Sequence, residues 1–258
     1  MDPILCNVAE RVMTVTMNRP EIMNAMDYES GAMLLDCLYR AQDDPEVRVV
    51  VLTGAGQGFC SGADVRRIGE GGREGTTRRL RDKHHMVIKM LREMPKPTLA
   101  AVNGPAVGLG CDFALACDLR IASDKAFFGE IFVKRGIMPD CGGTWLLPRI
   151  IGLGRTFEMI LLGERVYADE ALRIGMVNWV VPADKFKDEL DALSGKLAKG
   201  PPIAYAQIKK AINAGLQSDL ARGLEYEIDG QMICIASEDK QEGVQAWKEK
   251  REPEFKGR

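Results

Sequence analysis

Two aspartates lie beside glycine turns that are predicted to lead into helices. Asp112 closes the segment GLGCD at 108–112, and Asp140 lies within GIMPDCGGT at 136–144. The first turn of a helix has free backbone N–H groups and favours negative charge. A single glycine turn of this kind more often serves packing alone. Two such turns, each with a carboxylate, indicate a site that handles an anionic intermediate.

A third turn, GAGQGFCSGAD at 54–64, follows a predicted strand that ends at Thr53. Its small residues Gly62 and Ala63 allow the backbone to approach a ligand, as the segment 108–110 also does. One N–H group from each turn can then converge on the same oxygen atom. Preorganised donors of this type stabilise developing negative charge, each by on the order of 3 kcal/mol in the transition state.

Alternating or continuous apolar segments predict the strands that carry these turns. The predicted strands span 11–17, 47–53, 98–102 and 119–122, and predicted helices span 28–42, follow Leu109 and follow Asp140. Strands that feed helices in this way indicate an α/β organisation.

After Gly152 the strand signal fades and helical spacing dominates. The predicted helices there span 157–162, 169–174, 185–197, 203–214 and 220–237. We therefore expect the C-terminal third to form a helical subdomain that packs on the α/β core. The polar stretch 69–81 has little apolar content and predicts either a mobile loop beside the site or an ordinary solvated surface loop.

Composition restricts the class of protein. With 258 residues and 46% hydrophobic content, the chain can form one large domain or a domain with an appendage. A net charge of −2 and a pI near 5.9 leave no broad basic surface for nucleic acid or for a membrane. The N-terminal segment lacks a basic region followed by an apolar one, and no run reaches the roughly 20 apolar residues of a membrane span. We expect a cytoplasmic protein.

Seven cysteines and two histidines, His84 and His85, are present without any CxxC pair. This pattern argues against a disulfide framework and against a metal site, and it predicts reduced, mostly buried thiols. Cys111 and Cys141 adjoin the two aspartates and are alternative nucleophiles. No histidine is identifiable as a partner for either, which disfavours that role.

Four motifs occur in order along the chain: NRP at 18–20 with NAM at 24–26, FCSGAD at 59–64, NGPAVGLGCD at 103–112 and the segment 136–144. Together they resemble the crotonase superfamily of enoyl-CoA hydratases and isomerases over essentially the whole chain. The resemblance implies an α/β spiral of ββα units over 1–195 and a helical C-terminal trimerisation region over 196–258. It also implies homotrimers or homohexamers, a coenzyme A thioester as substrate and no further cofactor.

The same resemblance assigns the binding groups. The backbone N–H groups of Ala63 and Leu109 form the oxyanion hole that holds the thioester oxygen, which makes an enolate accessible. The residues implied in coenzyme A binding, largely through main-chain atoms, are Asn24, Ala25, Ser61, Ala63 and Asp64. Trp247 and Lys250 align with residues offered to a neighbouring subunit's coenzyme A, or else they belong to a solvated basic helix face.

The carboxylates differ from those of a hydratase, which holds a water between two glutamates. One glutamate aligns with Asp112 and the other with Phe132, so the second carboxylate is missing and hydration is disfavoured. Glu130 and Phe132 are assigned to the acyl pocket. Glu130 shares the side of Phe132 in a regular strand and can replace the missing group, whereas a turn would send it into solvent.

Asp140 occupies the position of an aspartate in ring-type and dienoyl-CoA isomerases, and the segment PDCGGTWLLPR at 139–149 resembles the epoxyphenylacetyl-CoA isomerase branch. We predict an isomerase in which Asp140 moves a proton between two carbons and Asp112 assists. Asp140 as a helix N-cap and Asp112 as a partner of the helix dipole are the structural alternatives. A hydratase, a CoA-thioester hydrolase and a non-catalytic CoA-binding scaffold are the functional alternatives.

Overall fold

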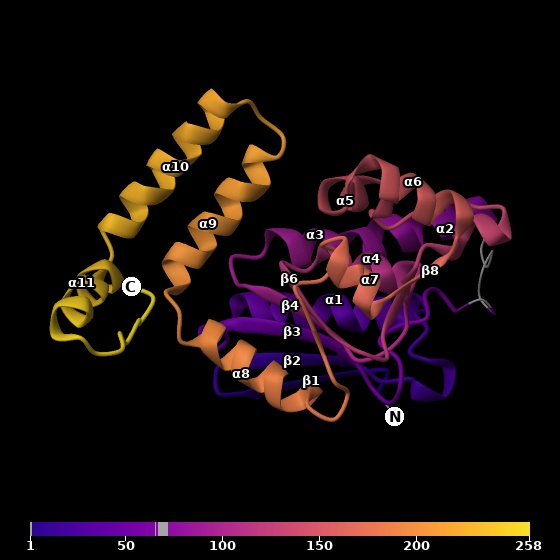
Figure 1. The fold of residues 1–258 in the computed structure, drawn as a ribbon, viewed down its shortest axis with the longest axis horizontal. Coiled ribbons are helices and arrows are strands. Elements are labelled where there is room, and N and C mark those ends of the chain that lie inside the picture. The colour runs from indigo at the N-terminus through magenta and orange to yellow at the C-terminus, as the bar shows by residue number, and fades with distance from the viewer. Residues whose placement is uncertain (1, 65, 67–71) are drawn as a thin grey trace.

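A six-stranded sheet lies at the centre of the computed structural model, which describes residues 2–64, 66 and 72–258 (Figure 1). Its strands lie in the order β1 (Ile4–Ala9), β2 (Val12–Met17), β3 (Val49–Gly54), β4 (Thr98–Val102), β6 (Leu119–Ser123) and β9 (Trp179–Val181). β1 pairs with β2 in antiparallel fashion, and the other neighbours are parallel. A smaller sheet contains β5 (Ala106–Val107), β7 (Phe127–Gly129) and β8 (Arg165–Tyr167). The predicted α/β class is confirmed.

Both faces of the large sheet are buried. Val50 and Leu52 face the main core, which is completed by α1 (Tyr28–Asp43), α3 (His85–Glu93) and α4 (Leu109–Ala116). Val51 faces the opposite side, where α8 (Phe186–Ala198) covers the sheet. Burial on both faces explains why β3, which contains these three residues, is almost continuously apolar.

Short helices surround the ends of the strands. They are α2 (Gly72–Arg79), the π-helical turn Leu80–His84, a 3-10 helix at Ile131–Arg135, α5 (Gly143–Ile150), α6 (Gly152–Leu162) and α7 (Ala168–Arg173). The interpretation of 69–81 as a loop is wrong for 72–81, which is helical, while 69–71 lie outside the described residues. None of the residues of α2 is buried, so the segment has no apolar stripe to indicate a helix.

Two strands form after Gly152, contrary to the expectation that strand structure ends there. β8 and β9 contain three residues each, which is too short for an alternating pattern to be recognised. β9 extends the large sheet because Ile121 of β6 pairs with Trp179. Tertiary pairing, and not local sequence pattern, therefore defines these strands.

The last three helices form a unit that we call the C-terminal arm, residues 202–258. It contains α9 (Pro202–Gly215), α10 (Leu220–Ile235) and α11 (Glu238–Glu249). α9 and α10 form a hairpin that stands away from the sheet, and α11 lies at its far end (Figure 1). Lys209 anchors α9 to the body, because its ammonium donates to Asp118 Oδ2 at 2.7 Å and to the Leu91 carbonyl at 2.8 Å.

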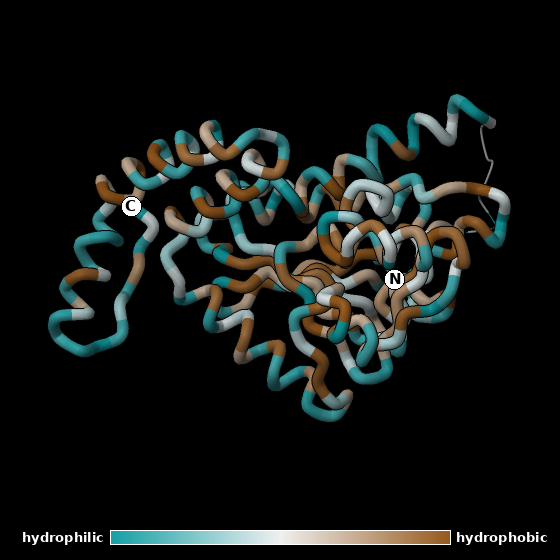
Figure 2. The backbone as a smooth tube through the Cα atoms, turned by 45° about the horizontal axis from the view of Figure 1, so that its top comes forward, coloured by the Kyte–Doolittle hydropathy of each residue, from teal (hydrophilic) through white to brown (hydrophobic). Residues whose placement is uncertain are grey.

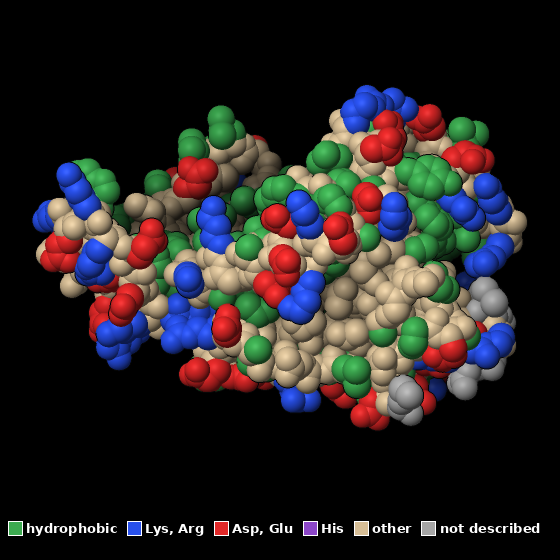
Figure 3. Space-filling view, turned by 60° about the horizontal axis from the view of Figure 1, so that its bottom comes forward, with side chains coloured by type: hydrophobic (Ala, Val, Ile, Leu, Met, Phe, Trp, Pro, Cys, Tyr) green, Lys and Arg blue, Asp and Glu red, His purple; other side chains and the backbone are tan. Residues whose placement is uncertain are grey.

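Large apolar side chains of the arm are exposed to solvent. Hydrophobic segments recur along its helices (Figure 2), and hydrophobic side chains are visible where the arm stands beside the body (Figure 3). At least half exposed are Ile208, Ile212, Leu220, Ile228, Met232 and Trp247. An exposed apolar surface of this extent indicates an interaction surface. Among the described residues, no helix has the length and apolar character needed to cross a membrane.

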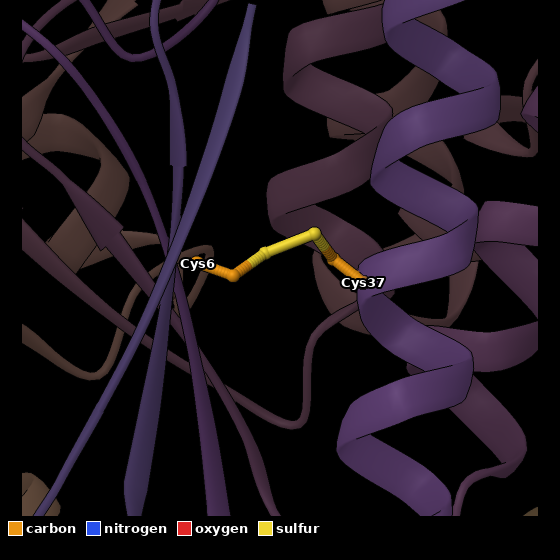
Figure 4. Close-up of a disulfide and its surroundings, with 2 residues drawn as sticks. All are labelled: Cys6 and Cys37. Atoms are coloured by element: carbon orange, nitrogen blue, oxygen red, sulfur yellow. A yellow bond between two sulfur atoms is a disulfide. The ribbon is translucent and has the colours of Figure 1, made fainter. Parts of the chain in front are cut away.

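A disulfide joins Cys6 of β1 to Cys37 of α1 (Figure 4). The expectation of reduced thiols is therefore wrong for this pair. The two residues are 31 positions apart, and only the packing of α1 against the sheet edge brings their Cα atoms to 6.6 Å. Cys60, Cys111, Cys117 and Cys141 are free and buried, as predicted.

Candidate active site

A cleft of about 820 Å³ opens beside the glycine turns. Its lining comes from four segments of the chain: 61–63 after β3, 76–84 of α2 and the π-helical turn, 107–109 before α4, and 131–141 before α5. The ends of parallel strands meet at one edge of the sheet, which brings these turns together. The predicted approach of the turns 54–64 and 108–110 is present, and the segment 131–141 lines the same cleft.

The first two turns are in direct backbone contact. The Val107 N–H donates to the Cys60 carbonyl at 2.9 Å, and a methyl group built on Gly110 would lie 2.2 Å from the same oxygen. Gly62 and Gly108 have φ values of +101° and +54°, in the region that favours glycine. Glycine at 110 is therefore required for the two turns to approach this closely.

Ala63 and Leu109 both line the cleft. A methyl group on Gly62 would lie 3.9 Å from the Leu109 nitrogen, so the two turns present their N–H groups near each other. Leu109 is the first residue of α4, where helix geometry provides no acceptor. In the part of the chain that the structure describes, neither N–H donates to a protein acceptor. Both remain available to a ligand oxygen.

Asp140 also lines the cleft, on the loop before α5. The residue is exposed, but protein atoms crowd its carboxyl, and this partial burial raises its pKa. The Cys141 thiol lies 3.4 Å from its Oδ1, and nearby His85 and Arg79 lower the pKa in opposition to burial. The His85 ring nitrogen Nε2 is 2.7 Å from the Asp140 carbonyl oxygen and holds the loop in place.

The capping alternative for Asp140 is not supported. α5 begins at Gly143, its N-cap is Gly142 with φ +106°, and no side chain caps it. The Asp140 carboxylate is therefore not used to complete the helix terminus.

Asp112 differs from Asp140 because it does not line the cleft. It lies in the first turn of α4 and is completely buried. Glu130 is completely buried as well. A methyl group on Gly143 would lie 2.7 Å from Asp112 Oδ1 and 3.3 Å from Glu130 Oε2, so both carboxyls face the same point. The structure thus places a second carboxyl beside Asp112.

Neither of these carboxyls has a hydrogen-bond partner of regular geometry among the described residues. Burial raises the pKa of Asp112 well above its usual range, and Glu130 and Asp140 raise it further. Burial raises the pKa of Glu130 to about 8. Two buried carboxyl groups this close to each other disfavour a second negative charge.

The two acyl-pocket residues point in different directions. Glu130 immediately precedes the 3-10 helix Ile131–Arg135, and this turn directs its side chain inward. The expectation that a turn would send Glu130 into solvent is therefore wrong. Phe132 lines the cleft, with its ring 3.4 Å from a methyl group built on Gly108.

The residues assigned to coenzyme A mainly hold the first turn together. The Asn24 amide donates to the carbonyls of Ala55 and Gly58 at 2.9 and 2.8 Å. Asp64 pairs with Arg66 at 2.7 Å, which holds the pKa of that carboxyl well below its usual range, and it also pairs with Arg19 at 3.1 Å. Their side chains are engaged within the protein, which leaves main-chain atoms for a ligand.

Of the remaining residues assigned to coenzyme A, Ser61 lines the cleft, whereas Ala25 is buried and outside the lining. Trp247 and Lys250 lie at the end of α11 in the C-terminal arm. Trp247 is 80% exposed, and α11 lies at the opposite end of the molecule from α2, whose residues line the cleft (Figure 1). The structure does not bring these two residues to the site of the same chain.

α2 and the π-helical turn form a further wall of the cleft, to which Thr76, Arg79, Leu80 and His84 contribute. One sequence interpretation placed 69–81 beside the site, but sequence reasoning missed His84 and the helical structure of the wall. His84 is buried, and this burial lowers its pKa to about 4, so the ring is neutral at pH 7. The adjacent histidines were the available signal for the part of the wall beyond residue 81. Burial also raises the pKa of Cys111 and of Cys141 well above the usual value, which keeps both thiols protonated and argues against a nucleophilic role.

The sequence matches known proteins along its whole length. The family described as Enoyl-CoA hydratase/isomerase matches residues 7–258. A probable enoyl-CoA hydratase of Rhodobacter capsulatus is 42% identical over 253 residues, which cover 97% of this chain and 96% of the relative. The 1,2-epoxyphenylacetyl-CoA isomerase of Escherichia coli is 39% identical over 261 residues, which cover 100% of this chain and 100% of the relative. A crotonyl-CoA hydratase of Syntrophomonas wolfei is 35% identical, with 98% of this chain and 97% of the relative covered.

The fold matches solved structures equally well. A crystal structure of an enoyl-CoA hydratase from Bacillus anthracis superposes with a TM-score of 0.96 at 36% identity, over the full length of both chains. The expected crotonase-like fold with a helical C-terminal part is confirmed. The chain therefore belongs to the enoyl-CoA hydratase/isomerase family of the crotonase superfamily.

Proposed function

We propose that the chain isomerises an unsaturated or cyclic acyl-CoA through an enolate, with Asp140 as the proton shuttle. The observation that supports this most is the difference between the two aspartates: Asp140 lines the cleft, whereas Asp112 is buried behind it. A shuttle needs one carboxylate that reaches two carbons, and the position of Asp140 in the cleft lining supports that role. Asp112 assists from the protein interior.

The proposed reaction uses the two N–H groups and one carboxylate. The thioester oxygen accepts hydrogen bonds from Ala63 and Leu109 while the Asp140 carboxylate takes a proton from one carbon of the acyl chain. The electron pair of the broken C–H bond moves into the conjugated system and onto the thioester oxygen. The protonated Asp140 then returns the proton to another carbon, which shifts the double bond and regenerates the carboxylate.

Coenzyme A binding is proposed for the main chain around Asn24, Ala25, Ser61, Ala63 and Asp64, with the CoA thioester as substrate and no other cofactor. We also propose that 196–258 is a trimerisation region attached to the core 1–195. The exposed apolar side chains of the C-terminal arm support assembly as a homotrimer or homohexamer. In such an assembly Trp247 and Lys250 reach the coenzyme A of a neighbouring subunit.

Hydration of a 2-enoyl-CoA is the second candidate function, and Glu130 favours it. The missing second carboxylate argued against a hydratase, but Glu130 turns inward beside Asp112. The Syntrophomonas wolfei relative is named a crotonyl-CoA hydratase. Against this function, neither Asp112 nor Glu130 lines the cleft.

Product analysis tests these proposals. The purified protein is incubated with 2-enoyl-, 3-enoyl- and ring-epoxide acyl-CoA thioesters, and the products are identified by mass spectrometry and NMR. A product of unchanged mass with a shifted double bond or rearranged ring supports the isomerase. A 3-hydroxyacyl-CoA as the main product supports the hydratase instead, and free coenzyme A indicates hydrolysis.

A further inference from the structure

Asp112 and Glu130 make up a buried acid pair behind Asp140, and neither of them lines the cleft. Their oxygens Oδ1 and Oε2 lie 2.7 and 3.3 Å from one point beside Gly143, and both residues have zero exposure. Neither carboxyl has a hydrogen-bond partner of regular geometry among the described residues. Burial of two acidic groups without compensation is costly unless they are neutral or share a proton.

The groups that face the pair do not neutralise it. The Asp140 carboxyl raises the pKa of both members, whereas the Cys111 thiol of α4 lowers that of Glu130 and the Gly143 N–H at the start of α5 lowers that of Asp112, and none of these groups carries a positive charge. Arg79 of α2 and His85 of α3 lie one step further out, where they lower the pKa of Asp140. The negative charge is therefore better compensated at Asp140 than at the pair.

We propose that Asp112 and Glu130 keep at least one proton between them at neutral pH and thereby leave Asp140 as the ionised carboxylate at the cleft. Both are positioning residues, because they act through Asp140 without lining the cleft. Ionisation of the pair at alkaline pH would add negative charge near the enolate and slow its formation. This catalytic consequence rests on the proposed function, whereas protonation of the pair is a property of the folded chain.

Infrared spectroscopy of the substrate-free protein tests the protonation directly. At pH 7 the wild-type protein should show a carbonyl band of a protonated carboxylic acid that shifts in D₂O. The Glu130→Gln and Asp112→Asn variants should each reduce or displace this band. Glu164→Gln is the matched control, because the Glu164 side chain is 70% exposed, and it should leave the band unchanged.

The pH profile of kcat/KM tests the effect on Asp140. In the wild-type protein the activity should fall at alkaline pH, and in Glu130→Gln this fall should move to higher pH while the acidic limb stays in place. In the double variant Asp112→Asn, Glu130→Gln, the alkaline fall of kcat/KM should move no further than in the single variant with the larger shift, because the two residues act as one unit. Circular dichroism confirms that each variant is folded.

The outcomes separate the two proposals. A wild-type infrared spectrum without the protonated-acid band, or one that neither variant changes, overturns the buried acid pair even when isomerase activity is present. A band that both variants remove, in a protein that isomerises no acyl-CoA, supports the pair and contradicts the proposed function. An active enzyme whose alkaline limb is the same in Glu130→Gln overturns the action of the pair on Asp140.

Discussion

Asp140 and Asp112 are the same residue type beside similar glycine turns, yet they lie in opposite environments. Asp140 is exposed to the cleft, with Arg79 and His85 nearby. Asp112 is completely buried and faces Glu130 without a regular hydrogen-bond partner. Carboxyl groups acquire different roles when their surroundings move their pKa values apart. The comparison teaches that burial, more than residue type, distinguishes the proposed base from its neighbours.

The largest expected effect comes from removing the exposed carboxylate. Asp140→Asn should lower kcat/KM for isomerisation by about 10²- to 10⁴-fold, because general acid-base catalysis contributes that much. Asp184→Asn, which changes an exposed loop aspartate, is the control. Steady-state kinetics on the substrate found by product analysis provide the measurement. Full activity in Asp140→Asn, with loss in Asp112→Asn, would reverse the assigned roles.

A methyl group placed between the buried carboxyls tests how tightly they are held. Gly143→Ala puts a carbon 2.7 Å from Asp112 Oδ1, so the pair must shift, and overpacking of this kind costs about 1–3 kcal/mol of unfolding free energy. Gly154→Ala in α6 is the matched control because nothing lies within 4 Å of its added methyl group. Urea denaturation measures the free energy of unfolding of both variants. Equal stability of the two variants would show that the pair is loosely packed.

Phe132→Glu tests whether the cleft, and not the interior, is where a hydratase needs its second carboxylate. The substitution places a carboxylate at the cleft wall, and we expect hydration of crotonyl-CoA to rise by about tenfold, or roughly 1.4 kcal/mol in barrier height. Phe132→Gln controls for the loss of the ring without adding charge. If the wild-type protein already hydrates crotonyl-CoA as fast as Phe132→Glu, the distinction between cleft and interior carboxyls fails.

The last prediction concerns stability as a function of pH, where the substitution leaves the cleft itself unchanged. The pKa of Glu130 rises from an ordinary 4.5 to about 8 in the folded chain. Between these values the folded state binds more protons than the unfolded state, so stability decreases as pH rises through this window. Urea unfolding from pH 5 to 9 should therefore show a steeper decline for the wild-type protein than for Glu130→Gln. If the unfolding free energies of the two proteins depend on pH in the same way, burial does not raise the pKa of Glu130.

Much of the fold was predictable because its signals are local. The apolar run at β3 and the glycine turns at 54–64 and 108–112 predicted the strand ends and the approach of Ala63 to Leu109. The spacing in 203–214 and 220–237 predicted α9 and α10. Each of these depends on residues within one element, so the sequence pattern alone carries the information.

The features that were not predicted depend on contacts between distant segments. Glu130 turns inward because a 3-10 helix begins at Ile131, and its burial beside Asp112 needs α4 and α5 in place. Cys6 meets Cys37 only through the packing of α1 on β1. The same holds for the cleft wall at 76–84, whose sequence is too polar to indicate a helix. The role of each site residue stays a prediction until kinetics test it.

The contact between Gly110 and the Cys60 carbonyl has a consequence for how this family diversifies. Since no side chain fits at Gly110, backbone packing alone sets the distance between the two turns that present the N–H groups of Ala63 and Leu109. Substitution of cleft residues such as Phe132 or Met138 leaves that distance unchanged. Side chains of the cleft can therefore change one at a time while the spacing of the two N–H groups stays the same.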